Sequence, residues 1–230
     1  MLNSAKDYKY RVYENLINLS ENGNPMPYEM FMILKVLEDN KEIKQPKVIY
    51  DIGSSLLHWT NTCKKVYPDA KYYLFDAFKP AEILYTEYDY HIGLLGDEDN
   101  KPTKYYVNDL LIGGNSMYRE NTEHYSPTNY TIENMRTLDS IVSEKGFLYP
   151  DLIKIDVQGA ELEVLKGASE CLKNCLYLII EIQNDDSNYN IGCHTAKTVI
   201  PYIESLGFKL FHKICENPSK VDADYLFIKE

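Results

Sequence analysis

Five short apolar runs constrain the fold of this chain more than any other feature of its sequence. The runs cover residues 48–50, 72–75, 91–95, 152–155 and 176–182. Their residues are apolar almost without interruption, which is typical of strands that are buried on both faces of a parallel sheet. We expect a helix after the first run, up to Val66, and another after the fourth, from about Ala160.

The C-terminal part of the chain follows a different pattern. A helix is expected at 196–206, and strands are expected at 208–214 and 225–228. Only a short polar stretch joins these two strands, which favours an antiparallel hairpin over a crossover connection. The sequence therefore predicts a doubly wound α/β sheet with an antiparallel end.

Two further regions lie outside this sheet. Residues 5–20 and 27–40 have the spacing of amphipathic helices, so we interpret residues 1–47 as a helical extension packed on the core and residues 48–230 as one globular unit. Residues 97–150 form a long insert with a glycine-rich stretch at 112–116, and a strand is expected near 130–135. Inserts of this length in compact domains are usually functional or disordered.

Composition limits the classes of partner. Lys and Arg total 24 against 35 for Asp and Glu, so the net charge is −11, and nucleic acid is not an expected partner. The five cysteines form no C-x-x-C pair, which favours buried free thiols in a reducing compartment. No apolar run approaches the ~20 residues of a membrane span, and the first residues do not resemble a signal peptide. We expect a soluble, cytoplasmic protein.

Acidic residues follow four of the five apolar runs. Asp51, Asp76, Asp156 and Glu181 each stand at or near the end of a run. Ligands of doubly wound sheets bind beyond the carboxyl ends of the strands, so these acids are the main functional signal in the sequence.

The first two of these acids suggest a nucleoside-containing cofactor. Gly53 allows a tight turn after the first strand, and Asp76 lies 25 positions after Asp51, where an acid commonly accepts hydrogen bonds from ribose hydroxyls. NAD would require G-x-G-x-x-G, but this turn has a single glycine. S-adenosylmethionine (SAM) carries a sulfonium and an amino group, both of which an acidic pocket containing Asp51 would favour. The sequence therefore favours SAM over NAD.

Several motifs resemble one protein family. Residues 151–168 resemble the signature segment of FkbM-type SAM-dependent methyltransferases, K-I-D-V-E-G-x-E followed by V-L-x-G-A. Residues 137–141 resemble the family's T-L-D-x-(I/L), residues 51–53 its first motif, residues 75–76 its F-E-P region and residues 114–117 its G-x-S-(L/M) loop. The resemblance runs from about Val48 to Ile228.

The resemblance implies a class I methyltransferase (Rossmann-like) fold, a mostly parallel seven-stranded sheet with its last strand antiparallel. Family members mostly methylate hydroxyl groups, often on sugars or glycosylated metabolites. The cofactor-binding residues that it implies are Asp51, Gly53, Ser54, Ser55, Asp76, Ala77, Gly96, Asp97, Ser116 and Asp156. The expected acceptor is a small molecule or a glycan.

Methylation of an alcohol requires a nearby base or cation, because the hydroxyl is a poor nucleophile until its proton is removed. Asp156 and Glu161 are candidate bases, although Glu161 could equally stabilise the first turn of the following helix. His124 and His194 are further candidates. Asp156, Glu181 and Asp185 could together bind Mg²⁺, or Asp185 and Asp186 could belong to a solvated loop.

The sequence departs from the family pattern at several positions. Leu57 replaces the second glycine of the first motif and Ser55 its asparagine, Gln158 replaces a glutamate, and Gln183 replaces a histidine. These departures leave open a non-catalytic cofactor-binding or partner-binding module. Residues 1–40 would then be an interaction surface for another enzyme or for a second copy in a homodimer. An NAD-dependent oxidoreductase is a further alternative. Tyrosines 118, 125 and 130 could form a stacking wall for a sugar ring or could pack the insert onto the sheet.

Overall fold

The computed structural model describes residues 34, 37, 44–216 and 221–230. The helix expected at 5–20 lies outside these residues. Of the helix expected at 27–40, only Leu34 and Leu37 are described, and both are helical and fully buried.

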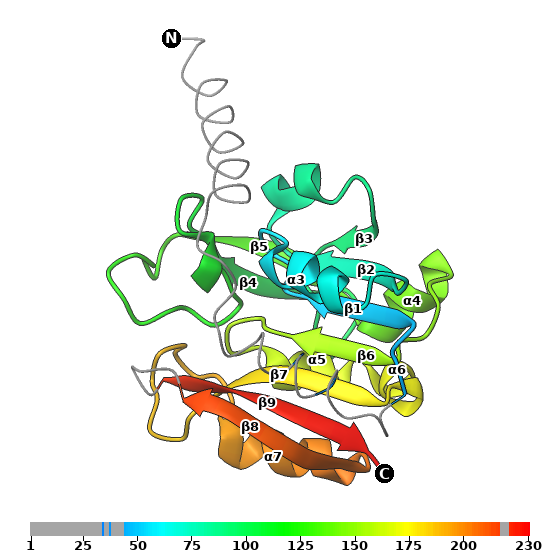
Figure 1. The fold of residues 1–230 in the computed structure, drawn as a ribbon. Helices are drawn as coiled ribbons and strands as arrows, with labels where there is room; N and C mark the ends of the chain where they lie inside the picture. The colour runs from blue at the N-terminus through cyan, green and yellow to red at the C-terminus, as the bar shows by residue number, and fades with distance from the viewer. Residues whose placement is uncertain (1–33, 35–36, 38–43, 217–220) are drawn as a thin grey trace.

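Seven strands form one mixed sheet (Figure 1) in the order β3-β2-β1-β6-β7-β9-β8. The strands are β1 (Val48–Ile52), β2 (Lys71–Asp76), β3 (Asp89–Ile92), β6 (Leu152–Ile155), β7 (Tyr177–Gln183), β8 (Phe208–Glu216) and β9 (Asp222–Lys229). Strands β3, β2, β1, β6 and β7 are parallel, whereas β9 inserts between β7 and β8 and runs antiparallel to both. This order and this antiparallel last strand are the class I methyltransferase topology, so the predicted fold class is confirmed.

The third strand differs from its prediction. The apolar pattern predicts a strand at 91–95, but β3 ends at Ile92. The Gly93 N–H still donates to the Asp76 carbonyl of β2, and the carbonyl oxygen of Leu94 then accepts a hydrogen bond from the backbone N–H of Arg136. Leu94 packs with Tyr105 and Met135 of the insert, and Leu95 packs in the main core of the sheet, so both are buried without continuing the strand.

Helices cover both faces of the sheet. One face packs against α4 (Leu138–Lys145), α5 (Glu161–Lys166), α6 (Ser169–Asn174) and α7 (Ala196–Ser205). The other face packs against α3 (His58–Val66), together with Leu34 and Leu37. Side chains of a strand alternate between faces, so Tyr50 joins the first core and Ile49 the second. Burial on both faces explains why the strands are continuously apolar.

The insert forms a separate two-stranded antiparallel sheet from β4 (Lys101–Tyr106) and β5 (Tyr130–Met135). Two short 3₁₀ helices, η1 (Lys79–Leu84) and η2 (Ile112–Gly114), flank the carboxyl ends of the central strands. Within the described residues, no helix combines the length and the apolar character that a membrane span requires.

Candidate functional site

A cleft lies at the carboxyl ends of the central strands. Its lining comes from the segments that follow β1, β2, β3 and β6, and from residues around η1 and η2. The lining residues are Ile52, Gly53, Ser55, Phe75, Asp76, Ala77, Phe78, Ala81, Gly93, Leu94, Leu95, Tyr105, Ile112, Gly113, Asn115, Ser116, Met117, Asp156, Val157, Gln158 and Ala160. They include the predicted cofactor-binding residues Gly53, Ser55, Asp76, Ala77, Ser116 and Asp156.

The turn after β1 requires glycine at position 53. Gly53 has a φ of +79°, and a Cβ atom there would lie 1.8 Å from the backbone oxygen of Asp156. The N–H groups of Gly53 and Ser54 both donate to the carbonyl oxygen of Phe75, at 2.9 and 3.1 Å. The turn is thus held against the end of β2 on one side and packs directly on the segment after β6 on the other.

Asp76 ends β2 and fixes the neighbouring turns. Its two carboxylate oxygens accept hydrogen bonds from the backbone N–H groups of Ser55 and Phe78, each at 2.7 Å. Burial raises the pKa of Asp76, and the bonds from Phe78 and Ser55 oppose that rise. A carboxylate oxygen has two lone pairs, so Asp76 keeps accepting capacity toward the cleft that it lines.

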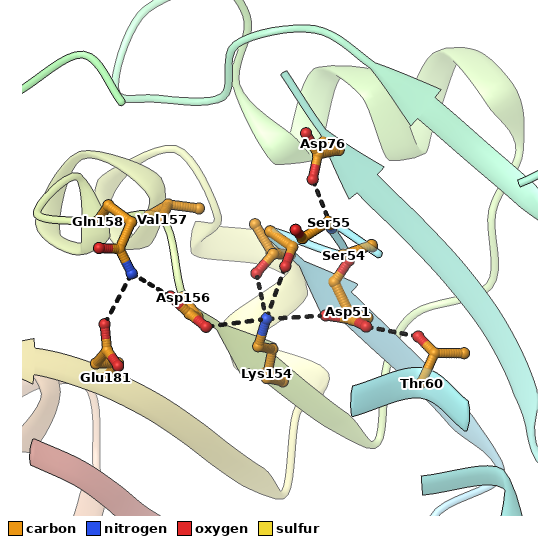
Figure 2. Close-up of polar contacts among 12 residues, drawn as sticks. Asp51, Ser54, Ser55, Thr60, Asp76, Lys154, Asp156, Val157, Gln158 and Glu181 are labelled. Atoms are coloured by element: carbon orange, nitrogen blue, oxygen red, sulfur yellow. Dashed lines mark hydrogen bonds and ion pairs between the residues drawn. The ribbon is translucent and has the colours of Figure 1, made fainter. Parts of the chain in front are cut away.

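Asp51 and Ser54 are buried and do not belong to the cleft lining. The Asp51 carboxylate accepts a 2.5 Å hydrogen bond from Thr60 and lies 3.2 Å from Lys154 Nζ (Figure 2). The Ser54 hydroxyl donates to the backbone oxygen of Asp51 at 2.6 Å. Since Lys154 compensates the Asp51 charge inside the protein, Asp51 is placed to support the turn and not to contact a bound cation.

Gly96 and Asp97 also lie outside the cleft lining. A Cβ atom at Gly96 would meet the Met135 sulfur at 2.0 Å, so this glycine serves close packing against the insert. Asp97 forms an ion pair with Lys101 at 3.2 Å. Because β3 ends earlier than the sequence predicts, residues 93–95 reach the cleft in place of residues 96–97.

Lys154 is the functional candidate that the motif analysis did not single out. Its side chain is only 3% exposed, and its Nζ lies 3.2 Å from Asp51 Oδ1 and 3.5 Å from Asp156 Oδ2. Burial alone lowers the pKa of Lys154, but the carboxylates of Asp51 and Asp156 raise it above its ordinary value. The available signal was a lysine inside an otherwise apolar run, since a buried charge requires a partner.

Asp156 lines the cleft just after β6, beside Gln158 and Glu181 (Figure 2). The Gln158 amide donates to Asp156 Oδ1 at 2.9 Å and to Glu181 Oε1 at 3.0 Å. Burial raises the pKa of Glu181 well above its usual range, and the nearby charges of Asp156, Asp222 and Asp224 add to the rise. Gln158 thus separates two acids, where a glutamate would place a third carboxylate.

The other predicted bases lie away from the cleft lining. Glu161 accepts hydrogen bonds from the backbone N–H groups of Val157 and Gly159 at 3.2 and 3.0 Å, and burial raises its pKa to about 8. It therefore shapes the segment before α5. His194 is half-exposed, with Nε2 3.6 Å from Glu163 Oε1, and the His124 side chain is exposed in the insert.

The Mg²⁺ prediction receives no support. Asp185 caps α7 by accepting hydrogen bonds from the Thr195 hydroxyl at 2.7 Å and the Lys197 N–H at 2.8 Å. These bonds lower the pKa of Asp185. In the part of the chain that the structure describes, no three His, Cys, Asp or Glu side chains are grouped to hold a metal ion.

Ser116 joins the insert to the segment after β6. It is 2% exposed, and its hydroxyl donates to the Val157 carbonyl at 3.1 Å while accepting from the Tyr118 N–H at 3.1 Å. The predicted tyrosine wall is not in the cleft lining. Tyr125 is buried within the insert, and Tyr130 packs against Tyr106 at a centroid distance of 5.7 Å. Tyr105, from β4, lines the cleft instead.

The Gln183 side chain forms hydrogen bonds inside the protein. It is 4% exposed and exchanges hydrogen bonds with Asn190, while accepting one from the Cys193 thiol at 3.2 Å. Asn190 in turn donates to the Tyr118 carbonyl at 3.0 Å. Gly159 packs on this group, since a Cβ atom there would lie 2.8 Å from the Cys193 Cβ. Residue 183 thus connects three segments and does not present its side chain to the cleft.

Solved structures with a similar fold have low sequence identity to this chain. The precorrin-6y C5,15-methyltransferase of Geobacter metallireducens is 9% identical, with a TM-score of 0.45 over 86% of this chain and 88% of that one. Human N-acetylserotonin methyltransferase in complex with SAM is 13% identical, with a TM-score of 0.41 over 96% and 67%. The fibrillarin pre-rRNA processing protein of Methanococcus jannaschii is 14% identical, with a TM-score of 0.46 over 81% and 68%. Other matched structures are longer, and this chain spans 50% and 53% of two of them.

A family model gives a more direct relationship. No curated protein matches the chain, but the model described as the methyltransferase FkbM domain matches residues 34–210. This match starts before the resemblance predicted from the sequence and covers every residue that lines the cleft. The chain therefore belongs to the FkbM methyltransferase domain family.

Proposed function

We propose that this protein transfers a methyl group from SAM to a hydroxyl group of a sugar, a glycan or a glycosylated small molecule. One observation carries the proposal: the Asp156 carboxylate lines the same cleft as the Gly53 turn and Asp76. A turn and a carboxylate that suit a nucleoside thus lie in one cavity with a second carboxylate that could act as a base.

The cleft suits SAM in shape and in chemistry. Gly53 lets the turn after β1 pack on the Asp156 backbone, so the ends of β1 and β6 meet at the cleft. Asp76 would accept hydrogen bonds from the ribose hydroxyls, and the apolar side chains of Phe78, Leu94 and Leu95 would contact the adenine. When bound, SAM supplies an electrophilic methyl group on a sulfonium centre.

Asp156 is the residue best placed to serve the acceptor. One of its oxygens accepts from the Gln158 amide, and the other faces the Lys154 ammonium at 3.5 Å. These contacts hold the carboxylate in one orientation. A charged carboxylate can accept the proton of an acceptor hydroxyl as that oxygen forms its bond to carbon. Holding the hydroxyl close to the donor methyl supplies much of the remaining rate enhancement.

Calorimetry and a methylation assay test this proposal together. SAM and its demethylated product should bind, whereas NAD should not. SAM labelled in its methyl group should then transfer label to members of a panel of hydroxylated sugars and glycosides. Binding of NAD without SAM would overturn the proposal, and SAM binding without transfer to any hydroxyl would favour a non-catalytic module.

A further inference from the structure

We propose that Lys154 is a positioning residue for methyl transfer, which fixes the Asp156 carboxylate and the Gly53 turn in one geometry. The inference rests on the proposed function, because it assigns Asp156 to the acceptor. It adds a buried cation that connects the two sides of the cleft.

The contacts of Lys154 reach both sides. Its Nζ donates to the Gly53 carbonyl at 2.8 Å and lies 3.4 Å from the Ile52 carbonyl, so it holds the backbone from which the cofactor turn starts. The same nitrogen lies 3.5 Å from Asp156 Oδ2. An ammonium group has three donors, and these contacts together with Asp51 use them in three directions (Figure 2).

Sheet register explains why a lysine occupies this position. Asp51 on β1 and Lys154 on β6 are direct cross-strand neighbours, and both side chains are almost completely buried. Asp51 is also held by Thr60 on α3, so its carboxylate is fixed from the opposite side. The ion pair therefore anchors Lys154 on one side, and its other contacts are with the Gly53 turn and with Asp156.

The charge balance supports a positioning role over a purely structural one. A buried Asp51–Lys154 pair alone would be neutral, and replacing such a pair by apolar residues often costs little stability. Here Lys154 has a second acidic partner, because it also faces Asp156, whose side chain is 24% exposed. Lys154 thus connects a carboxylate inside the protein to a carboxylate that faces the cleft.

The test requires a variant that removes Lys154 without leaving Asp51 as a lone buried charge. D51N/K154M removes both charges and retains an oxygen that can accept from Thr60. D51N alone keeps the Lys154–Asp156 contact. K71M/D89N is a matched control, since Lys71 and Asp89 form a 2.9 Å cross-strand ion pair at the exposed edge of the sheet. For each protein we would measure the melting temperature, the affinity for the demethylated cofactor, kcat and the KM for the acceptor.

The proposal predicts a folded D51N/K154M protein with kcat at least about tenfold lower and with an acceptor KM within about threefold of the parent. Its affinity for the demethylated cofactor should fall by about threefold or more, a readout that needs no turnover. D51N, which keeps the contacts of Lys154 with Asp156 and Gly53, should lose less kcat than D51N/K154M, and the exposed-edge control should match the parent. A folded D51N/K154M protein with parental affinity and kcat would overturn the proposal.

The variant D156N separates this proposal from the proposed function. If D156N loses turnover but D51N/K154M does not, Asp156 serves the acceptor and Lys154 does not position it. If D156N retains turnover, the assignment of Asp156 fails, and the Lys154 inference fails with it. A D51N/K154M protein that does not fold, alongside a stable D51N, would make Lys154 a structural residue and would also overturn the inference.

Discussion

The two walls of the cleft are built in different ways. The β1–β2 wall, residues 53–55 and 76–78, is held by backbone groups and one carboxylate over a sequence separation of 21 residues. The β6–β7 wall consists of residues 115–117 and 156–160 at the cleft, with residues 118–121 and 183–193 packed behind them. It is held by side chains that reach across 41 residues from Ser116 to Val157 and 72 residues from Asn190 to Tyr118.

This difference suggests a division of work. A wall made of backbone suits a ligand whose shape does not vary, because backbone geometry depends little on which side chains are present. A wall made of side chains from distant segments can change with a few substitutions, as acceptor recognition requires. We therefore expect cofactor affinity to depend on the β1–β2 wall, and turnover on the β6–β7 wall.

The largest effect is expected for D156N, on the β6–β7 wall. The amide keeps the size of the side chain but removes the base, so kcat should fall about 100-fold or more. Affinity for the demethylated cofactor, measured by calorimetry, should stay within about threefold of the parent. D185N, which alters the cap of α7 outside the cleft, is the control and should retain kcat. A D156N protein that loses cofactor affinity and turnover equally would contradict the assignment of cofactor binding to the β1–β2 wall and of turnover to the β6–β7 wall.

The converse effect is expected for D76A, on the β1–β2 wall. The variant loses the proposed acceptor for the cofactor ribose, and a hydrogen bond to a charged group contributes roughly 1.5–3 kcal/mol. Cofactor affinity should therefore fall about tenfold or more. The N–H groups of Ser55 and Phe78 also lose their acceptor, so a lower melting temperature is expected. If D76A binds the cofactor as tightly as the parent does, the ribose lies elsewhere in the cleft.

The sequence predicted the β1–β2 wall better than the β6–β7 wall, and the reason is physical. Gly53 and Asp76 follow from rules about how a parallel strand ends, and both line the cleft. The same rules placed Asp51 in the cleft, but they do not say which face of the strand a side chain occupies. Its cross-strand register with Lys154 puts it inside the protein.

The β6–β7 wall depends on contacts that no local pattern encodes. Gln183, Asn190 and Tyr118 meet only after the sheet and the insert have packed together. For this reason the family pattern indicated only that Gln183 replaces a histidine. In the structure its side chain is buried and does not line the cleft. Likewise, the local pattern could not show whether Glu161 acts as a base or accepts hydrogen bonds from backbone N–H groups, as it does in the structure.

A smaller effect is expected for Q183A, which tests whether the β6–β7 wall is a connected unit. Removing the amide leaves buried groups of Asn190 without their partner, at a cost of about 1–3 kcal/mol in unfolding free energy. The melting temperature and kcat should both fall, while cofactor affinity stays close to that of the parent. N184A, at the neighbouring position, is a comparison variant whose side chain bonds to the Asp222 carbonyl instead. A loss of cofactor affinity in Q183A with unchanged kcat would contradict the comparison of the two walls.

The smallest effect concerns Leu57, where the family's first motif has glycine. Leu57 has a φ of +65° and precedes α3, yet its side chain is 8% exposed and packs with Leu74 and Phe78. The position thus combines a left-handed backbone, which costs a non-glycine residue roughly 1–2 kcal/mol, with a buried apolar side chain that offsets this cost.

Comparing L57G with L57A isolates the backbone contribution, because both variants lose the packed side chain. Glycine is ordinarily less stable than alanine by roughly 0.5–1 kcal/mol, but at this φ the order should reverse, with L57G more stable by about 1 kcal/mol in denaturant unfolding. Leu56 does not have a positive φ and is the matched control, so L56A should be more stable than L56G. Both Leu57 variants should still bind the demethylated cofactor, because the residue supports the β1–β2 wall from below and does not line the cleft. An L57A protein more stable than L57G would mean that the turn relaxes out of the left-handed region, and that the glycine of the family motif serves contact with the ligand and not the backbone conformation.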